Sequence, residues 1–392
     1  MHVLLIPIKY PSSYKRQSHV FFEEQARALS LNDATVGVLA VIPVSLRQMW
    51  KQKKIDLGSS QELVNGVQLF RYQYPVIPKM WRFNSWLQTR IGKHQFLRYQ
   101  KKHGAPDIVH VHVSLAGKVA IWISRTFQIP YVVTEHYTSF IEGNMPSWQK
   151  ELAGNVFTHS KKNIAVSKEF AVKLQHDYHL DFEYIPNIVD TGVFTPHPQR
   201  GPMQSVRNFL NIGNLYRQKN QGMLIRAFSR AFKGEEDFKL VIAGSGPEYS
   251  RLKKIASELN MQKQISFFGQ ANRGEVAALM QDSDCFVLSS RYETFGVVVI
   301  EAMSCGLPVI ATRSGGPESI ITEEKLGMLC DIDEDQLTDA LSGITKNRYD
   351  SDYIRKYALA NFSSEIIATR LKDLYLQVLN RDGDIKYEAG IR

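Results

Sequence analysis

The sequence has few cysteines and lacks the features of several common protein classes. Its three cysteines, Cys285, Cys305 and Cys330, are too few and too irregularly spaced for a disulfide framework or a zinc site, so we expect small buried hydrophobic residues. No apolar run reaches the roughly 20 residues that a membrane-spanning helix needs. The first residues, MHVLLIPIKYPSS, lack the basic start and the small-residue cleavage site of a signal peptide. We therefore expect a cytoplasmic protein.

The loop after the first predicted strand contains no glycine. A strand is predicted over 3–8 and a helix near VFFEEQARAL, and the KYPSSYKRQSH segment between them has none. A dinucleotide-binding fold would carry G-x-G-x-x-G at this place, because glycines let the backbone approach the cofactor phosphates. Its absence argues against a nicotinamide- or flavin-dependent dehydrogenase.

Acidic residues are scarce in the first half of the chain. Residues 1–198 contain 23 basic and 14 acidic residues, whereas 199–392 contain 25 of each, so the whole net charge of +9 lies in the first half. All 11 histidines lie there too. The simplest interpretation is a protein with one basic and one neutral part.

No acidic residue occurs between Glu62 and Asp107, where basic residues alternate with aromatic ones: Arg71, Lys79, Trp81, Arg82, Phe83, Trp86, Arg90, Lys93, Phe96, Arg98, Tyr99, Lys101 and Lys102. Such a segment, 71–102, suits anionic lipid headgroups. It is equally typical of a solvated helix with ordinary core aromatics. Nucleic acid is a third possible partner, but the chain resembles no known binding module, so we expect none.

Short apolar runs alternate with stretches of helical length through the second half: NFLNIG, KLVIAG, ISFFG, CFVLSS, LPVIAT and GMLC. This alternation predicts a doubly wound parallel sheet, whose ligands bind beyond the carboxyl ends of the strands. A chain of 392 residues has room for two domains. The segment 196–205, rich in proline, glycine and polar residues, predicts the hinge between them.

The stretch 290–316, SRYETFGVVVIEAMSCGLPVIATRSGG, predicts a strand, a loop and a helix with an anion site. The backbone N–H groups at a helix start have no partners of their own and favour negative charge. Residues 297–300 are apolar on every face of one turn, which indicates a helix buried all round. The carboxylate of Glu301 therefore needs a cation, backbone donors or ligand hydroxyls. Gly315 and Gly316 precede Pro317, which predicts a second loop that feeds a helix.

These motifs closely resemble the E-x7-E signature of the family 4 retaining glycosyltransferases. ETFGVVVIE is followed by AMSCGLPVIAT and then by GGPE. The resemblance implies that Glu293 contacts the donor sugar and that Glu301 holds the ribose. It also implies that the amides between them, at Thr294, Phe295 and Gly296, hold the distal phosphate.

Two further segments resemble the phosphate and nucleotide segments of this family. IGNLYRQKN places Lys219 in the lysine position, whereas Asn214 stands where arginine is often found, with Arg217 as an alternative source of the cation. IAGSGPE resembles the G-x-G-P turn against the nucleotide, which implies that Gly244 and Gly246 approach it.

The first half contains two histidine-rich strands, predicted over 106–112 and 131–140. Alternation places His110 and His112 on one face. By resemblance, His136 in the T-E-H ending lies beside the donor sugar, and His112 is a structural neighbour. The alternative is a zinc site made of the three histidines and Glu135, but no metal-binding motif supports it and we expect no metal. The D-x-D spacing within 331–335 predicts a helix N-cap.

The resemblance implies the GT-B architecture, in which two Rossmann-like doubly wound domains face a cleft. Residues 1–198 would bind the acceptor and 207–363 the donor, and a final helix at about 364–380 would pack back on the first domain. The glycine that the family often carries near Ser18 is missing.

The implied activity is that of a retaining glycosyltransferase (EC 2.4 class) without a cofactor. It would move a sugar from a nucleotide-diphosphate sugar to a glycan or a lipid-linked acceptor, such as a cell-surface polysaccharide precursor, as a peripheral protein on the inner membrane face. The alternatives are a nucleotide-sugar epimerase or hydrolase on the same scaffold, and a basic nucleic-acid-binding protein.

Overall fold

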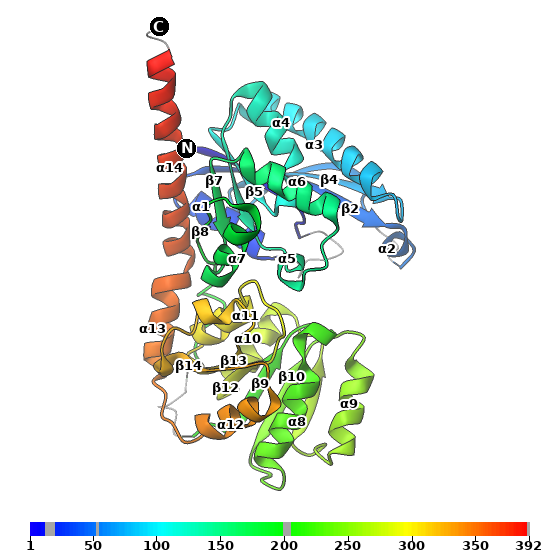
Figure 1. The fold of residues 1–392 in the computed structure, drawn as a ribbon, viewed down its shortest axis with the longest axis vertical. Coiled ribbons are helices and arrows are strands. Elements are labelled where there is room, and N and C mark those ends of the chain that lie inside the picture. Colours follow the sequence, from blue (N-terminus) through cyan, green and yellow to red (C-terminus); the bar gives the residue numbers. More distant parts are fainter. Residues whose placement is uncertain (12–19, 52–54, 199–204, 390–392) are drawn as a thin grey trace. The chain divides into compact units, whose positions relative to one another are not determined.

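The chain divides into two units, each built on its own sheet of mostly parallel strands (Figure 1). The structure is a computed structural model that describes residues 1–11, 20–51, 55–198 and 205–389. Ser18 and residues 199–204 of the predicted hinge lie outside the described residues. Unit 1 comprises Met1–Val166, Ala171–Ile185 and Ser364–Arg392, and unit 2 comprises Ser167–Phe170 and Pro186–Ser363. Residues 186–198, which the sequence assigned to the first domain, are therefore part of unit 2.

Unit 1 contains an eight-stranded sheet in the order β3-β4-β2-β1-β5-β6-β7-β8. Its strands are β1 (His2–Pro7), β2 (Thr35–Ser45), β3 (Gly58–Val64), β4 (Val67–Val76), β5 (Ile108–His112), β6 (Tyr131–Glu135), β7 (Lys162–Ala165) and β8 (Glu183–Tyr184). Neighbours are parallel except for β3 and β4. The sequence did not predict β3, because this edge strand is mostly polar and exposed and has no apolar run.

The helices of unit 1 pack in two sets. α1 (Val20–Leu31) packs on α14 (Ser364–Ala389), and α3 (Trp81–His103) packs on α4 (Lys118–Phe127). Right-handed crossovers that run in opposite directions from β1 place helices on opposite faces of such a sheet. The remaining helical segments are α2 (Leu46–Lys51), η1 (Ser114–Ala116), α5 (Ser139–Glu142), α6 (Ser147–Thr158) and α7 (Lys168–Tyr178), the last of which begins in unit 2. α14 extends beyond the end predicted near residue 380.

Unit 2 contains six parallel strands in the order β11-β10-β9-β12-β13-β14. They are β9 (Asn208–Ile212), β10 (Lys239–Ala243), β11 (Ile265–Gly269), β12 (Cys285–Leu288), β13 (Val309–Thr312) and β14 (Gly327–Cys330). Each corresponds to one of the six apolar runs, so the predicted doubly wound sheet is confirmed. The sequence succeeds here because the interior strands are buried on both faces and therefore apolar throughout.

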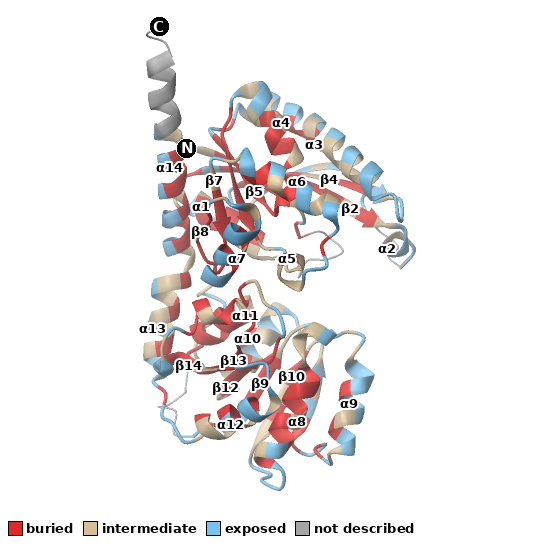
Figure 2. Cartoon of the chain, in the orientation of Figure 1, coloured by how far each residue is buried: buried red, intermediate tan, exposed pale blue. Residues whose placement is uncertain are grey.

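Helices connect these strands: α8 (Gln221–Phe232), α9 (Tyr249–Glu258), α10 (Arg273–Gln281) and α11 (Val297–Ser304). Two more, α12 (Glu334–Ile344) and α13 (Ser351–Phe362), follow the last strand. Three 3₁₀ turns, η2 (Arg217–Lys219), η3 (Pro317–Ser319) and η4 (Glu324–Leu326), occur in the loops. Pro317 therefore begins a single 3₁₀ turn rather than the predicted helix. In both units the buried residues concentrate on the strands and on the helix sides that face them (Figure 2). Among the described residues, no helix is long and apolar enough to cross a membrane.

His110 connects the sheet of unit 1 to the C-terminal helix. Its side chain is fully buried, with Nδ1 2.6 Å from the hydroxyl of Tyr375 on α14 and Nε2 2.7 Å from the hydroxyl of Thr134 on β6. Burial, together with His136 nearby, lowers the pKa of His110 to about 3. The imidazole is therefore neutral and donates from only one nitrogen.

Gly37 lets α3 approach the sheet closely. A Cβ atom at Gly37 would lie 2.0 Å from the hydroxyl oxygen of Tyr99. Tyr99 is fully buried, and this oxygen also lies 2.5 Å from Nε2 of His2. The tyrosine is thus fixed from two sides and cannot move away from a methyl group.

We predict that Gly37→Ala lowers the free energy of unfolding by about 1–3 kcal/mol, because the added methyl group overpacks the core. Chemical denaturation measures this change. Gly274→Ala is the matched control, since it lies exposed in the first turn of α10 and its nearest neighbour would be 3.5 Å away. Equal losses of stability in the two variants would contradict the proposed contact.

We also predict that acid destabilises the fold through His110. The unfolded chain binds a proton near pH 6.5 and the folded imidazole only near pH 3, so the free energy of unfolding falls as the pH drops between these values. This contribution is about 2 kcal/mol between pH 7 and pH 5. His110→Gln should flatten the dependence, whereas His176→Gln, whose side chain is 86% exposed, should retain it. An unchanged slope in His110→Gln would show that the histidine is not responsible.

Candidate functional site

The carboxyl ends of β9 and β12 bring together a lysine and a glutamate that lie 74 residues apart in the sequence. Lys219 ends the turn η2 after β9, and Glu293 lies in the loop after β12. Nζ of Lys219 pairs with Oε1 of Glu293, and the hydroxyl of Ser290 donates to the same oxygen at 2.7 Å. Only 21% and 12% of the two charged side chains are exposed, so little water screens their attraction. The sequence did not identify Ser290, which ends the apolar run CFVLSS.

Hydrogen bonds hold the surrounding loops in place. The hydroxyl of Ser289 donates to the carbonyl of Lys219 at 2.9 Å, and the backbone N–H of Glu293 donates to the carbonyl of Ser314 at 2.9 Å. The loops that follow β9, β12 and β13 therefore form one connected surface at the carboxyl edge of the sheet. This edge is where doubly wound sheets bind ligands.

Glycines shape the entry to α11. Gly296 adopts a left-handed conformation, with φ of 101°, at the N-cap of this helix. A Cβ atom at Gly316 would lie 2.3 Å from the carbonyl oxygen of Phe295, so the two loops touch through their backbones. The N–H of Gly315 donates to both oxygens of Glu318, at 3.1 and 3.0 Å, and burial raises the pKa of that carboxyl group. Glu318 belongs to the GGPE motif, but its hydrogen bonds to the backbone of Gly315 were not predicted from the sequence.

One side of α11 is open, which corrects the prediction of a helix buried all round. Val299 and Ile300 are fully buried, but Val297, Val298 and Glu301 are only partly buried. Residues 297, 298 and 301 are spaced to share one helix face. Glu301 lies on this face, one turn beyond the helix start.

The predicted nucleotide turn packs against the loop after β9. Cβ atoms at Gly244 and Gly246 would lie 1.9 Å from the carbonyl oxygen of Gly213 and 2.3 Å from that of Leu215. Only glycine allows this approach. In the same loop, Asn214 and Arg217 have exposed side chains.

In unit 1, Glu135 holds the turn that presents His136. One carboxylate oxygen accepts from the backbone N–H and the hydroxyl of Ser114 at 3.0 and 2.6 Å, and the other accepts from the N–H groups of His136 and Tyr137, both at 2.8 Å. The side chain is fully buried, and burial raises its pKa against the opposing effect of these four bonds. β6 ends at Glu135, so the predicted strand over 131–140 is too long.

The ring of His136 lies among other aromatic rings. Its Nε2 is 3.2 Å from Nδ1 of His112, and its centroid lies 5.2 Å from that of Phe22. The rings of His110 and His112 lie with their centroids 4.2 Å apart and tilted by 32°, which confirms that they share a face. Protein hydrogen bonds occupy both nitrogens of His110 and both oxygens of Glu135, and the described residues contain no cluster of His, Cys, Asp and Glu side chains arranged to hold a metal ion.

The D-x-D segment is an N-cap, as predicted. The carboxylate of Asp333 accepts from the backbone N–H groups of Asp335 and Gln336, at 2.9 and 3.0 Å, and so begins α12. Its acceptor capacity is used within the helix start.

Two family models match adjoining parts of the chain. The model described as Glycosyltransferase Family 4 matches residues 24–193, and that described as Glycosyl transferases group 1 matches residues 197–360.

The relatives are similar over most of the chain. An N-acetyl-alpha-D-glucosaminyl L-malate synthase from Bacillus anthracis is 27% identical over 294 residues, which cover 70% of this chain and 76% of that protein. An alpha-monoglucosyldiacylglycerol synthase from Streptococcus pneumoniae is 26% identical over 295 residues, 70% of this chain and 67% of that protein.

Among solved structures, sucrose-phosphate synthase from Thermosynechococcus elongatus superposes with a TM-score of 0.78 at 20% identity, covering 97% of this chain and 99% of that one. This likeness shows that the two parallel-sheet units form the GT-B fold. Since the two family models together span nearly the whole chain and its relatives are named as enzymes that attach sugars, the protein belongs to glycosyltransferase family 4 and is a glycosyltransferase.

Proposed function

We propose that unit 2 binds a nucleotide-diphosphate sugar and that the enzyme transfers this sugar, with retention of anomeric configuration, to an acceptor bound by unit 1. The observation that supports this most strongly is the pair Lys219 and Glu293, held beside the N-terminus of α11 at the carboxyl edge of the sheet. A cation and a carboxylate side by side suit a ligand with an anionic end and a hydroxyl-rich end.

The diphosphate would lie between Lys219 and the start of α11. The ammonium group and the free N–H groups of the first helical turn both favour negative charge. The loop at Gly315 and Gly316 is in backbone contact with Phe295, and the N–H of Gly316 would supply a further donor, since that of Gly315 already donates to Glu318. As the bond to the sugar breaks, charge grows on the diphosphate, and preorganised donors stabilise it without rearrangement. These groups supply positive charge themselves, so we propose that no metal ion is needed.

The carboxylates would orient the rest of the donor. Glu293 would accept hydrogen bonds from the sugar hydroxyls, because Lys219 and Ser290 hold its carboxylate in place. Glu301, on the open face of α11, would hold the ribose through its two hydroxyls. His136 in unit 1 would contact the sugar, with Glu135 fixing its backbone. Asn214, or Arg217 nearby, would face the phosphates, and Gly244 and Gly246 would adjoin the nucleotide.

The acceptor is proposed to be a lipid-linked or polysaccharide precursor at the cytoplasmic face of a membrane. The exposed stripe of α3 supports this proposal: Phe83, Trp86, Arg90, His94, Leu97 and Lys101 recur at three- and four-residue spacing, and all are exposed. Phe96 and Tyr99 on the opposite face are core residues. Aromatic residues beside basic ones are typical of helices that lie on anionic lipid. The Streptococcus pneumoniae relative, named for a glucosylated diacylglycerol, agrees with a lipid acceptor.

We predict that Lys219→Met weakens the binding of a nucleoside diphosphate by about 10- to 100-fold but has little effect on the monophosphate, because one charge-assisted bond to the distal phosphate is lost. Calorimetric titration with UDP, GDP, ADP and the monophosphates measures this change. Glu293→Gln should bind the same diphosphate normally and should lose about 10²–10³-fold in transfer rate with the matching nucleotide sugar.

Lys346→Met, on the exposed surface of unit 2, is the matched control and should bind like the unaltered protein. Unchanged diphosphate binding in Lys219→Met, with thermal melting showing a folded protein, would contradict the proposed site. Sugar release or epimerisation from the donor alone, at the rate seen with acceptor, would favour the epimerase or hydrolase alternative.

We predict that the protein cosediments with vesicles of phosphatidylglycerol at low salt and not with phosphatidylcholine vesicles. Each basic residue near an anionic surface contributes about 1 kcal/mol, so the double variant Arg90→Gln and Lys101→Gln should bind about 30-fold more weakly. Lys150→Gln, exposed on α6 of the same unit, is the control. Equal sedimentation with both lipids would reject the membrane proposal.

A further inference from the structure

Lys118 is a partly buried cation without an acidic partner. It is the first residue of α4, and its Nζ donates to the hydroxyl of Ser85 on α3 at 3.0 Å. Within the described part of the chain, no carboxylate pairs with it. Burial and the nearby charge of Arg82 lower the pKa of the Lys118 amine. A charge taken out of water needs compensation, and a neutral hydroxyl supplies little of it.

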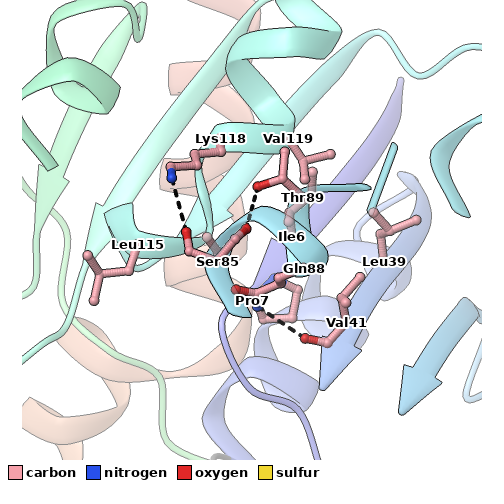
Figure 3. Close-up of a pocket in the computed structure, with 11 residues that line it drawn as sticks. Ile6, Pro7, Leu39, Val41, Ser85, Gln88, Thr89, Leu115, Lys118 and Val119 are labelled. Carbon is pink, nitrogen blue, oxygen red and sulfur yellow. Dashed lines mark hydrogen bonds between the residues drawn. The ribbon is translucent and has the colours of Figure 1, made fainter. Parts of the chain in front are cut away.

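The lysine borders a pocket beside the carboxyl end of β1 and the middle of β2 (Figure 3), and Leu115 and Ala116, in the turn η1 after β5, also line it. Pro7 and Val41 form the strand side, Ser85, Gln88 and Thr89 on α3 form another side, and Lys118 closes the pocket from α4. β1 lies between β2 and β5 in the sheet. The chain passes from β1 to β2 on one side and later returns to form β5 on the other side of β1. Doubly wound sheets bind ligands at this kind of switch point, outside the carboxyl ends of the strands.

The chemistry of the pocket favours an anion. One N–H of the Gln88 amide donates to the carbonyl oxygen of Val41 at 3.3 Å, and the hydroxyl of Thr89 donates to the backbone carbonyl oxygen of Ser85 at 2.8 Å. Lys118 still has donors to offer, because an ammonium group has three N–H bonds and no acceptor. The first turn of α4 contains no acidic residue, and its backbone dipole adds positive potential at the same point. The remaining N–H bonds of the Lys118 ammonium group suit a carboxylate or a phosphate.

The size of the pocket limits how a ligand enters. Its enclosed part has room for about one water-sized group, so only the end of a ligand fits. Apolar side chains of Ile6, Leu39 and Val119 form much of the wall. An anionic oxygen would reach Lys118 while the rest of the molecule stays outside.

We propose that Lys118 and Ser85 bind the anionic group, a phosphate or a carboxylate, of the acceptor. This inference rests on the proposed function, which assigns the acceptor to unit 1, and it identifies the acceptor's chemical class as a negatively charged hydroxyl compound. The same group could belong to a free metabolite or to a lipid headgroup, and Arg82 adds favourable potential in either case.

The test is the reactivity of the Lys118 amine towards acetic anhydride, followed residue by residue with mass spectrometry on the full chain. Inorganic phosphate is the probe, compared with sodium chloride at equal ionic strength. At a phosphate concentration about ten times its dissociation constant, acetylation of Lys118 should slow by about tenfold. Acetylation of exposed Lys150 should not change, which provides an internal control.

A second arm identifies the source of the anion. Vesicles of phosphatidylcholine with phosphatidic acid are compared with vesicles of phosphatidylcholine alone. Protection by the acidic vesicles but not by phosphate would assign the pocket to a lipid headgroup, and protection by phosphate alone would assign it to a free ligand. Protection by neither probe would overturn the proposal, and the pocket would then be a site for a water molecule.

Variants separate this inference from the proposed function. With the unit 2 site saturated by nucleoside diphosphate, which both variants should bind as before, Lys118→Gln should abolish the further thermal stabilisation that phosphate gives, whereas Ser85→Ala should only reduce it. If the unaltered protein does not bind nucleoside diphosphate, the proposed function alone is rejected. Full phosphate stabilisation in a folded Lys118→Gln protein would reject the Lys118 site alone.

Discussion

The ion pair between Lys219 and Glu293 is the interaction on which the donor site depends. Both groups are largely shielded from water, so neither is stable there without the other. The hydroxyls of Ser289 and Ser290 and the backbone carbonyl of Ser314 restrict the pair further. The loops after three strands therefore hold one arrangement before any ligand arrives. A preorganised site has less conformational freedom to lose when the ligand binds.

Backbone contacts at glycine reinforce this arrangement. Gly244, Gly246 and Gly316 each lie so close to a neighbouring carbonyl that a single methyl group would not fit. These contacts bring the loops together without side chains between them, and they leave N–H groups near the place proposed for the phosphates. The left-handed Gly296 then directs the chain into α11. Glycine residues, which have no Cβ atom, thus determine both the shape and the electrostatics of this edge of the sheet.

The polar groups that unit 1 removes from water are of two kinds, which differ in the partners that the protein provides. His110 is kept neutral and bonded at both nitrogens, and Glu135 receives four hydrogen bonds, so both are satisfied by the protein. Among the residues that the structure describes, the hydrogen-bond partner of Lys118 is the neutral hydroxyl of Ser85. Satisfied groups hold the fold in place, whereas a charge without a counter-charge favours an external anion. This contrast distinguishes the polar residues that stabilise the unit from Lys118, which is proposed to bind the acceptor substrate.

The sequence alone determined the strands of unit 2 and the helix cap at Asp333, because apolar runs and capping residues act over a few neighbours. The motif around Glu293 also indicated the family. Only the tertiary structure decided that Lys219 meets Glu293, that Tyr375 meets His110 across 265 residues, and which aromatic residues of α3 face water. Parallel strands place the carboxyl ends of segments that are far apart in the sequence at one edge of the sheet. The local hydrophobic periodicity does not predict the order of those strands in the sheet.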